Sequence, residues 1–187
     1  MKVIDTPFTE VKIIQLDSHP DDRGLFVETW NAEHLNFLNA KPEWVQDCFS
    51  LSRQKGTLRG LHFQLPPAEQ SKLVRASKGS LYDVVVDVRH GSPTFGHHFS
   101  IILRSNEHKQ LYVPSGFAHG FCTLEDDTEI TYKIAGPYAP ELSGGILWND
   151  PDLGIDWPID EADAILSEKD QAYLPLKTLP AIFDIKP

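Results

Sequence analysis

The sequence has little cysteine and no long apolar run. Its two cysteines, Cys48 and Cys122, have no spacing that pairs them, and two free thiols are typical of a reducing cytosol. No apolar stretch approaches the roughly 20 residues that a transmembrane helix requires. The N-terminal segment has neither a long apolar run nor a small-residue cleavage site, so we expect no signal peptide and a cytoplasmic location.

Positive charge is also scarce. Lys and Arg number 17 against 27 Asp and Glu, which gives a formal net charge of −10. Such a chain has no general field that attracts nucleic acid or an anionic membrane, so we expect neither as a partner. An anionic substrate would need a local basic cluster. The candidates are Arg23, Arg53, Lys55, Arg59, Lys72 and Arg75. Arginines suit a diphosphate, although for any single one of these residues solvated surface charge is the usual role.

Short strand patterns fill most of the chain, with turn residues such as Gly91-Ser92-Pro93 and Asp126-Asp127 between them. The predicted strands are Val11–Leu16, Gly24–Trp30, Leu73–Ala76, Ser80–Val88, His98–Leu103, Gln110–Val113, Gly120–Leu124 and Thr128–Ile134. Many short strands at even spacing predict an all-β antiparallel sandwich or barrel. The length suits one domain over residues 1–187. No glycine-rich fingerprint follows a strand, so we expect no bound dinucleotide.

Helical patterns are few and short. Asn31–Asn39 predicts one helix, and Ala162–Ala172 predicts another near the C-terminus. Ser167 precedes Glu168-Lys169-Asp170 and is a suitable N-cap for the second helix. Few helices and the lack of a strand–helix–strand rhythm argue against a doubly wound fold.

The segment Gly56–Gln64, GTLRGLHFQ, carries the first candidate site residues. On a regular strand Arg59 and His62 would point to opposite faces, unless a bulge re-aims one of them. A His62 that points into a barrel would be a half-buried imidazole available for proton transfer. The alternative is a hydrogen-bonded structural histidine.

A Pro-x-Gly turn precedes the second candidate, His119, in the segment PSGFAHGF. This pattern resembles the second conserved motif of cupin barrels, in which the histidine is a metal ligand. A metal cupin also has a His-x-His pair and a nearby Glu, but the earlier motif here reads His62-Phe63-Gln64. The adjacent His97 and His98 would face opposite ways on a strand. We therefore expect no bound metal, and His119 is either a pocket histidine or a turn-packing one.

The roles of two further residues depend on where the fold places their side chains. Tyr132 lies late in a predicted strand, and a tyrosine aimed into a barrel is a general acid. A core tyrosine with one hydrogen bond is the alternative. Asp170 would matter if it lay behind His62, because a carboxylate on one ring nitrogen fixes the tautomer and stabilises the imidazolium.

Several segments together resemble the dTDP-4-dehydrorhamnose 3,5-epimerase family, from about Phe8 to Leu174. The matching segments include DDRGLFVETW, LRGLHFQ, KLVRASKGSLYDVVVDVRHGSPTFG, LYVPSGFAHGFCTL, TYKIAGPYAP, LWNDPDLGIDWP and LSEKD. The resemblance implies a cupin-type jelly-roll homodimer that needs no cofactor. It also implies epimerisation at C3 and C5 of a dTDP-4-dehydro-6-deoxy sugar, in dTDP-L-rhamnose biosynthesis.

The resemblance assigns roles to ten residues. His62 resembles the base, Asp170 its orienting partner, Tyr132 the acid on the far face of the sugar, and Lys72 the stabiliser of the C4 enolate. The implied substrate-binding residues are Arg23, Glu28, Gln46, Arg59, His119 and Tyr138. Arg23 and Glu28 belong to an N-terminal segment that family members exchange across the dimer, so they are expected to serve the partner's site.

The chain departs from the family pattern near the expected nucleotide contacts. Cys48-Phe49 stands where relatives commonly have Asn-His, and Ser143 stands where many have Glu. These departures leave open a single-site epimerase acting at C3 or C5 of a related sugar nucleotide. A non-catalytic sugar-nucleotide-binding barrel and a metal-dependent cupin oxygenase are the remaining alternatives.

Overall fold

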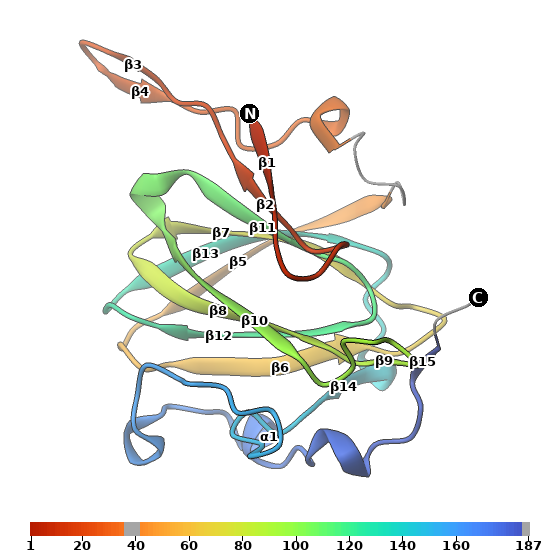
Figure 1. Ribbon diagram of the computed structural model, residues 1–187. Coiled ribbons are helices and arrows are strands. Elements are labelled where there is room, and N and C mark those ends of the chain that lie inside the picture. Colours follow the sequence, from red (N-terminus) through yellow and green to blue (C-terminus); the bar gives the residue numbers. More distant parts are fainter. Residues whose placement is uncertain (36–41, 185–187) are drawn as a thin grey trace.

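Two antiparallel sheets lie face to face in the structure, a computed structural model that describes residues 1–35 and 42–184 (Figure 1). The first has six strands in the order β1 (Lys2–Asp5), β2 (Lys12–Gln15), β11 (Lys109–Val113), β7 (Ser71–Lys78), β13 (Thr128–Ala135) and β5 (Trp44–Ser52). The second has five, in the order β10 (His98–Arg104), β8 (Ser80–Asp87), β12 (Phe117–Thr123), β6 (Leu58–Gln64) and β14 (Ser143–Gly145). Neighbouring strands are mostly far apart in the sequence. The predicted all-β jelly roll is confirmed.

The main core lies between the two sheets. Strand alternation places Val74, Leu111 and Ile130 of the six-stranded sheet against Val85 and Phe121 of the five-stranded sheet, and all five are buried. These side chains fill part of the space between the sheets, and Val74, Phe121 and Ile130 also border the cavity described below.

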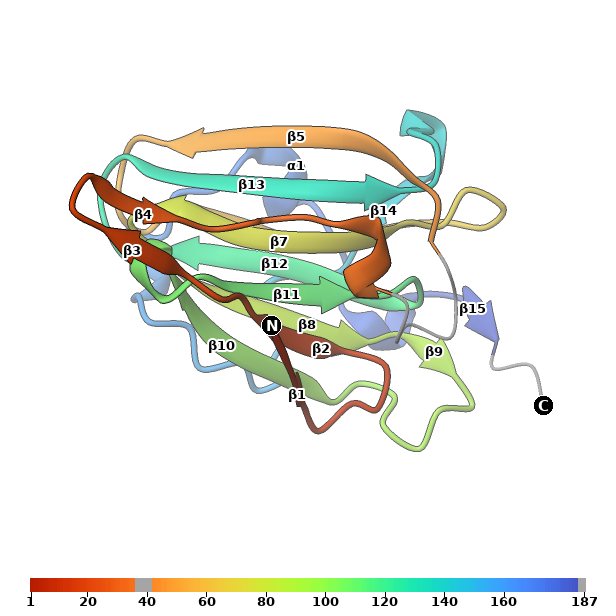
Figure 2. The ribbon, with the colours of Figure 1, turned by 90° about the horizontal axis from the view of Figure 1, so that it is seen from above.

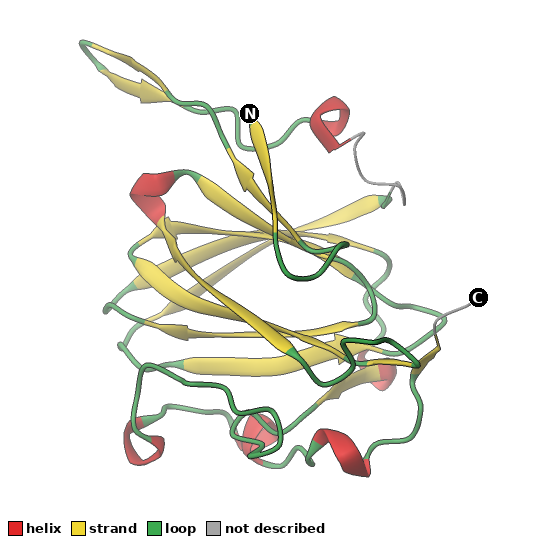
Figure 3. Ribbon diagram, viewed as in Figure 1, coloured by secondary structure: helices red, strands yellow, loops and turns green. Residues whose placement is uncertain are grey.

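The C-terminal segment covers the outer face of the five-stranded sheet. Leu61 and Phe63 of β6 point outward and pack with Ile146, Leu153 and Phe183. In Figure 1 this segment lies below the sheets, and Figure 3 shows that its helices are short. They are η3 (Pro140–Leu142), η4 (Glu161–Asp163), α1 (Glu168–Gln171) and η5 (Leu176–Thr178). The layer gives β6 an apolar backing, which fixes which of its residues face the interior.

The predicted helices are shorter than expected. α1 begins after Ser167, whose hydroxyl accepts a hydrogen bond from the Asp170 backbone N–H at 3.1 Å, as the N-cap prediction requires. In the N-terminal region, η1 spans Ala32–Leu35. The rest of the helix expected over Asn31–Asn39 lies outside the described residues.

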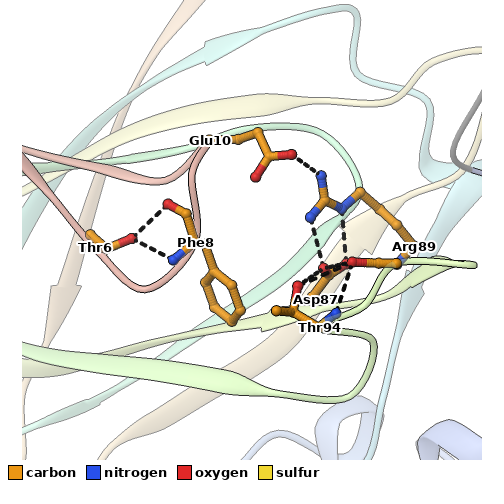
Figure 4. A network of polar contacts seen from close by, with 7 residues as sticks. Thr6, Phe8, Glu10, Asp87, Arg89 and Thr94 are labelled. Carbon is orange, nitrogen blue, oxygen red and sulfur yellow. Dashed lines mark hydrogen bonds and ion pairs between the residues drawn. The ribbon is translucent and has the colours of Figure 1, made fainter.

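A buried ion pair fastens the N-terminal loop to the barrel (Figure 4). The fully buried Asp87 carboxylate accepts hydrogen bonds from Arg89 Nη2 at 2.7 Å, Ser92 Oγ at 2.6 Å and Thr94 Oγ1 at 2.7 Å. Arg89 also donates from Nη1 to Glu10 Oε1 at 2.5 Å. Asp87 and Arg89 therefore pair inside the protein, and the contact of Arg89 with the half-exposed Glu10 holds the start of the chain across the sheet edge.

Most predicted strands are present, but several observed strands, among them β1, β5, β6 and β14, were not predicted. Of the expected strand Gly24–Trp30 only β4 (Gly24–Phe26) forms, paired with β3 (His19–Asp21) in a hairpin that projects from the body (Figure 1). Strand β5 was missed because its polarity is inverted. Its apolar Val45 and Phe49 face outward, and its polar Gln46 and Ser50 face inward. No helix in the described ranges is long and apolar enough to cross a membrane.

Candidate active site

The space between the sheets contains a cavity of about 530 Å³, here called the active-site cavity. Seven of the ten predicted site residues line it: His62, Tyr132, Asp170, Lys72, Arg59, His119 and Tyr138. They come from both sheets, from the loop that follows β13 and from α1, so the fold brings together segments that are far apart in the sequence. Concave sites with a few convergent polar groups are the usual form of a small-molecule site.

A one-residue bulge in β6 turns Arg59 and His62 to the same side. His62 is opposite His119 on β12 and Arg59 is opposite Phe121, so β6 has one residue more than β12 between these two pairs. Gly60 occupies the extra position with a φ of +136°, and a Cβ there would lie 2.5 Å from the Gly120 Cα. Regular alternation would have separated the two side chains, and the bulge brings both into the cavity.

His62 forms a close pair with Asp170. His62 Nε2 and Asp170 Oδ1 are 2.5 Å apart, and the aspartate is only 4% exposed. Burial raises the pKa of Asp170, but hydrogen bonds from His62, Ser167 and the Gly60 backbone outweigh burial and hold this pKa below its usual value. The charged carboxylate can therefore orient the imidazole and stabilise its protonated form.

Tyr132 and Lys72 lie on the opposite wall, on β13 and β7 of the six-stranded sheet. Burial raises the pKa of Tyr132, the neighbouring Cys48 adds to this, and Arg59 opposes it, so the phenol keeps its proton at neutral pH. Burial lowers the pKa of Lys72 to about 8, against the attraction of Asp83. One wall thus offers a proton acceptor, and the other offers a proton donor and a cation.

Asp83 is a site residue that the sequence interpretation missed. It is fully buried on β8, and His119 Nε2 lies 2.9 Å from its Oδ1 and 3.1 Å from its Oδ2. It therefore orients His119 and also attracts Lys72. The sequence did carry a signal, because Asp83 and Asp87 are the two acids of the otherwise apolar segment Ser80–Val88, and a buried acid needs a polar partner.

The cavity mouth carries two cations and an aromatic ring. Arg59 and Lys169 line the cavity, and Lys169 Nζ donates to Ser143 Oγ at 3.0 Å. Tyr138 lies beside them and is 69% exposed. In an acidic chain these groups form the local basic cluster that an anionic substrate requires. Lys169 lies in the matching segment LSEKD, but the sequence indicated no role for it.

Three predicted residues do not line the cavity of a single chain. Arg23 lies in the turn of the projecting hairpin and pairs with Asp21 at 2.6 Å. Glu28 follows the hairpin and accepts a hydrogen bond from Asn31 at 3.1 Å. Gln46 faces inward on β5 beside the cavity, and its amide is 3.4 Å from the Gly136 carbonyl oxygen.

Groups of three or more His, Cys, Asp or Glu side chains suited to a metal ion are absent from residues 1–35 and 42–184. His62 and His119 are each paired with a different carboxylate. The polar groups of the cavity are therefore arranged as two separate histidine–aspartate pairs.

Two stacked antiparallel sheets with polar side chains lining an interior cavity define the chain as a cupin-type jelly roll. A family profile described as dTDP-4-dehydrorhamnose 3,5-epimerase matches residues 5–178. The chain therefore belongs to the dTDP-4-dehydrorhamnose 3,5-epimerase family, as its sequence resemblance predicted.

Individual relatives agree with this assignment. The dTDP-4-dehydrorhamnose 3,5-epimerase of Sinorhizobium fredii is 48% identical over 93% of this chain and 89% of its own length. The dTDP-6-deoxy-D-glucose-3,5-epimerase of Legionella pneumophila, solved with dTDP-4-keto-L-rhamnose, superimposes with a TM-score of 0.94 at 40% identity, covering 100% of this chain and 99% of its own. The Bacillus anthracis enzyme, solved with TDP and PPi, gives a TM-score of 0.88 at 45% identity, covering 92% and 97%.

Proposed function

We propose that this chain inverts C3 and C5 of dTDP-4-dehydro-6-deoxy-D-glucose to give dTDP-4-dehydro-L-rhamnose, in dTDP-L-rhamnose biosynthesis. The observation that carries the proposal is the pairing of His62 with Asp170 on one wall of a cavity whose opposite wall presents Tyr132. The names of the relatives support the substrate. Residues 1–187 would act as one catalytic domain.

The chemistry requires two proton-transfer groups on opposite faces of the sugar ring. The C4 ketone acidifies the hydrogens at C3 and C5, so His62 can remove one of them as the base, supported by the Asp170 carboxylate. Lys72 would stabilise the negative charge on O4 of the resulting enolate. Tyr132 would return a proton from the other face, which inverts the carbon. No electrons are transferred, so the reaction needs no redox cofactor.

The nucleotide end would bind at the cavity mouth. Arg59 and Lys169 supply positive charge for the diphosphate, and the exposed Tyr138 ring supplies a stacking surface for the base. His119 and the inward-facing Gln46 would contact the substrate deeper in the cavity and along β5.

The active protein would be a homodimer in which the β3–β4 hairpin enters the partner's site. The hairpin projects from the body, and its Leu25 and Phe26 are 58% and 67% exposed. Apolar side chains this exposed favour a protein contact. Arg23 and Glu28, which lie in and beside the hairpin, would then reach the nucleotide bound by the other subunit.

NMR in D₂O with dTDP-4-dehydro-6-deoxyglucose tests the reaction, with and without EDTA. We expect deuterium to enter at both C3 and C5, unaffected by EDTA, and to be lost at both positions in His62→Ala. Exchange at one carbon alone would replace the proposal with the single-site epimerase. Inhibition by EDTA would point to a metal enzyme, and no exchange at either carbon would point to another sugar nucleotide or a non-catalytic binding protein.

A further inference from the structure

A second cavity, of about 420 Å³, lies on the opposite face of the six-stranded sheet from the active-site cavity. We call it the outer pocket. Its floor is a row of facing residues, with Arg75 on β7 opposite Thr131 on β13, and Thr131 opposite Phe49 on β5. Figure 2 looks down on this face, where β5, β13, β7 and β11 lie side by side. Thr29 and Trp30 close one side of the outer pocket.

Arg75 is a half-buried cation without an acceptor. Within the described part of the chain, it has no hydrogen bond or ion pair. Burial lowers its pKa and no carboxylate opposes the effect. Arginine stays protonated in proteins, so its partly desolvated charge is uncompensated in the isolated chain.

The neighbouring cation shows that the uncompensated charge is confined to Arg75. Lys133, also in the outer pocket, is fully paired: its Nζ lies 2.7 Å and 2.8 Å from the two carboxylate oxygens of Asp47 and 4.6 Å above the centre of the Trp30 ring. The Thr131 hydroxyl, opposite Arg75, is buried without a partner among the described residues. A guanidinium and a hydroxyl side by side match the two oxygens of a carboxylate.

We propose that the outer pocket receives a carboxylate from a second copy of this chain, which pairs with Arg75 across the subunit interface. The inference rests on the homodimer proposed above and adds a charged site to it. In a two-fold dimer the same contact would form twice. Two ionic contacts, one in each outer pocket, would then fix the register of the two sheets.

A protein carboxylate fits better than a free anion for two reasons. Val45 and Phe49 lie on the same face and are 51% and 60% exposed, and a small ion would leave them in water, whereas a second subunit would cover them. The chain also carries 27 acidic residues against 17 basic ones, so its own surface offers many carboxylates to a cationic pocket.

Sedimentation velocity over a dilution series tests the contact with Arg75→Gln. We expect its dimer to dissociate roughly 30-fold or more readily than the wild type, because one partner of a buried charge pair is lost. The matched control is Arg53→Gln, whose guanidinium is exposed and pairs with Asp127 of its own chain at 3.1 Å. Equal dissociation constants for Arg75→Gln and the wild type would overturn the proposal.

Crosslinking identifies the partner and does not depend on a destabilised variant. Arg75→Lys keeps the charge and adds an amine that a carbodiimide can couple to an adjacent carboxylate. We expect a covalent dimer whose peptides join residue 75 of one subunit to an acidic residue of the other. Arg53→Lys should instead crosslink to Asp127 within one chain. An absence of intersubunit peptides at residue 75 would refute the proposal.

The free-anion alternative and the catalytic proposal are tested separately. A thermal shift with inorganic phosphate that disappears in Arg75→Gln would assign the outer pocket to a small anion and overturn the proposal. Arg75 does not line the active-site cavity. A wild-type protein with an Arg75-dependent dimer but no deuterium exchange would therefore refute the epimerase proposal alone.

Discussion

Replacing Asp170 with asparagine removes the negative charge behind His62 while keeping nearly the same shape. The carboxylate is buried and lies 2.5 Å from His62 Nε2. A hydrogen bond to a charged group contributes about 1.5–3 kcal/mol. If that energy supports the imidazolium only after the proton has moved, its loss slows proton abstraction by roughly 10- to 150-fold. We expect kcat to fall by this factor with little change in KM.

Deuterium incorporation at C3 and C5, measured over a range of substrate concentrations, separates kcat from KM. Glu168→Gln is the matched control, because Glu168 lies on the same short helix, is exposed and does not line the cavity. A purely structural role for Asp170 would lower thermal stability in proportion to activity. The argument fails if Asp170→Asn retains the wild-type kcat, or if only KM rises.

Three further changes test other parts of the structure. Tyr132→Phe removes a phenol whose raised pKa keeps its proton, so inversion at C5 should slow by about 100-fold or more while some solvent exchange persists in the NMR assay. Lys72→Met should lower the rate at pH 7 by about 100- to 1,000-fold, and it should abolish the fall in wild-type activity that we expect as pH rises through about 8. Asp87→Asn leaves Arg89 with Glu10 alone, which should cost about 3 kcal/mol and lower the Tm by roughly 6–12 °C in calorimetry.

The Asp87 effect should depend on pH in one direction. Burial raises the pKa of Asp87, but hydrogen bonds from Arg89, Ser92 and Thr94 outweigh it and lower the folded-state value. A lowered carboxyl pKa stabilises the fold above the unfolded pKa, and that stability is lost as pH falls through the folded one. The difference in Tm between wild type and variant should therefore be full at pH 7 and shrink below about pH 4. A difference in Tm that does not change with pH would contradict this account of Asp87.

The other two variants have their own refuting outcomes. An unchanged product yield in Tyr132→Phe would remove Tyr132 as the acid. A loss of activity above about pH 8 that persists in Lys72→Met would remove Lys72 as the cause of that loss.

The sheets were predictable wherever interior residues are apolar. Strand β8 reads as a buried strand because Leu81, Val84, Val85 and Val86 are all excluded from water. Strand β5 could not be found in this way. Its inward side chains border a polar cavity and its outward ones bear the apolar surface, so the usual polarity of a strand is reversed. A period-two pattern gives the strand but not which face is inside.

The resemblance predicted seven residues that line one cavity, whereas the contacts between them were not predictable. His62 and Asp170 are 108 residues apart, and only the covering of the five-stranded sheet by the C-terminal segment brings them together. Asp83 was missed because it lies inside an otherwise apolar strand, outside the polar motifs. The outer pocket was also not predictable, because nothing in the sequence distinguishes Arg75 from the other basic residues near His62.

The bulge in β6 interrupts the regular alternation of the strand at the residues of the proposed site. The proposed base His62 and the proposed phosphate-binding Arg59 are three positions apart, so on a regular strand they would face opposite sides, with Arg59 directed away from the cavity. One extra residue restores both to the interior, and it requires glycine at two facing positions because Gly60 and Gly120 leave no room for a Cβ. The bulge thus serves the site rather than the sheet, because the β6–β12 ladder would pair more regularly without it. The bulge lies between Arg59 and His62 in a strand that otherwise alternates, so its structural effect is to direct these two side chains to the same face.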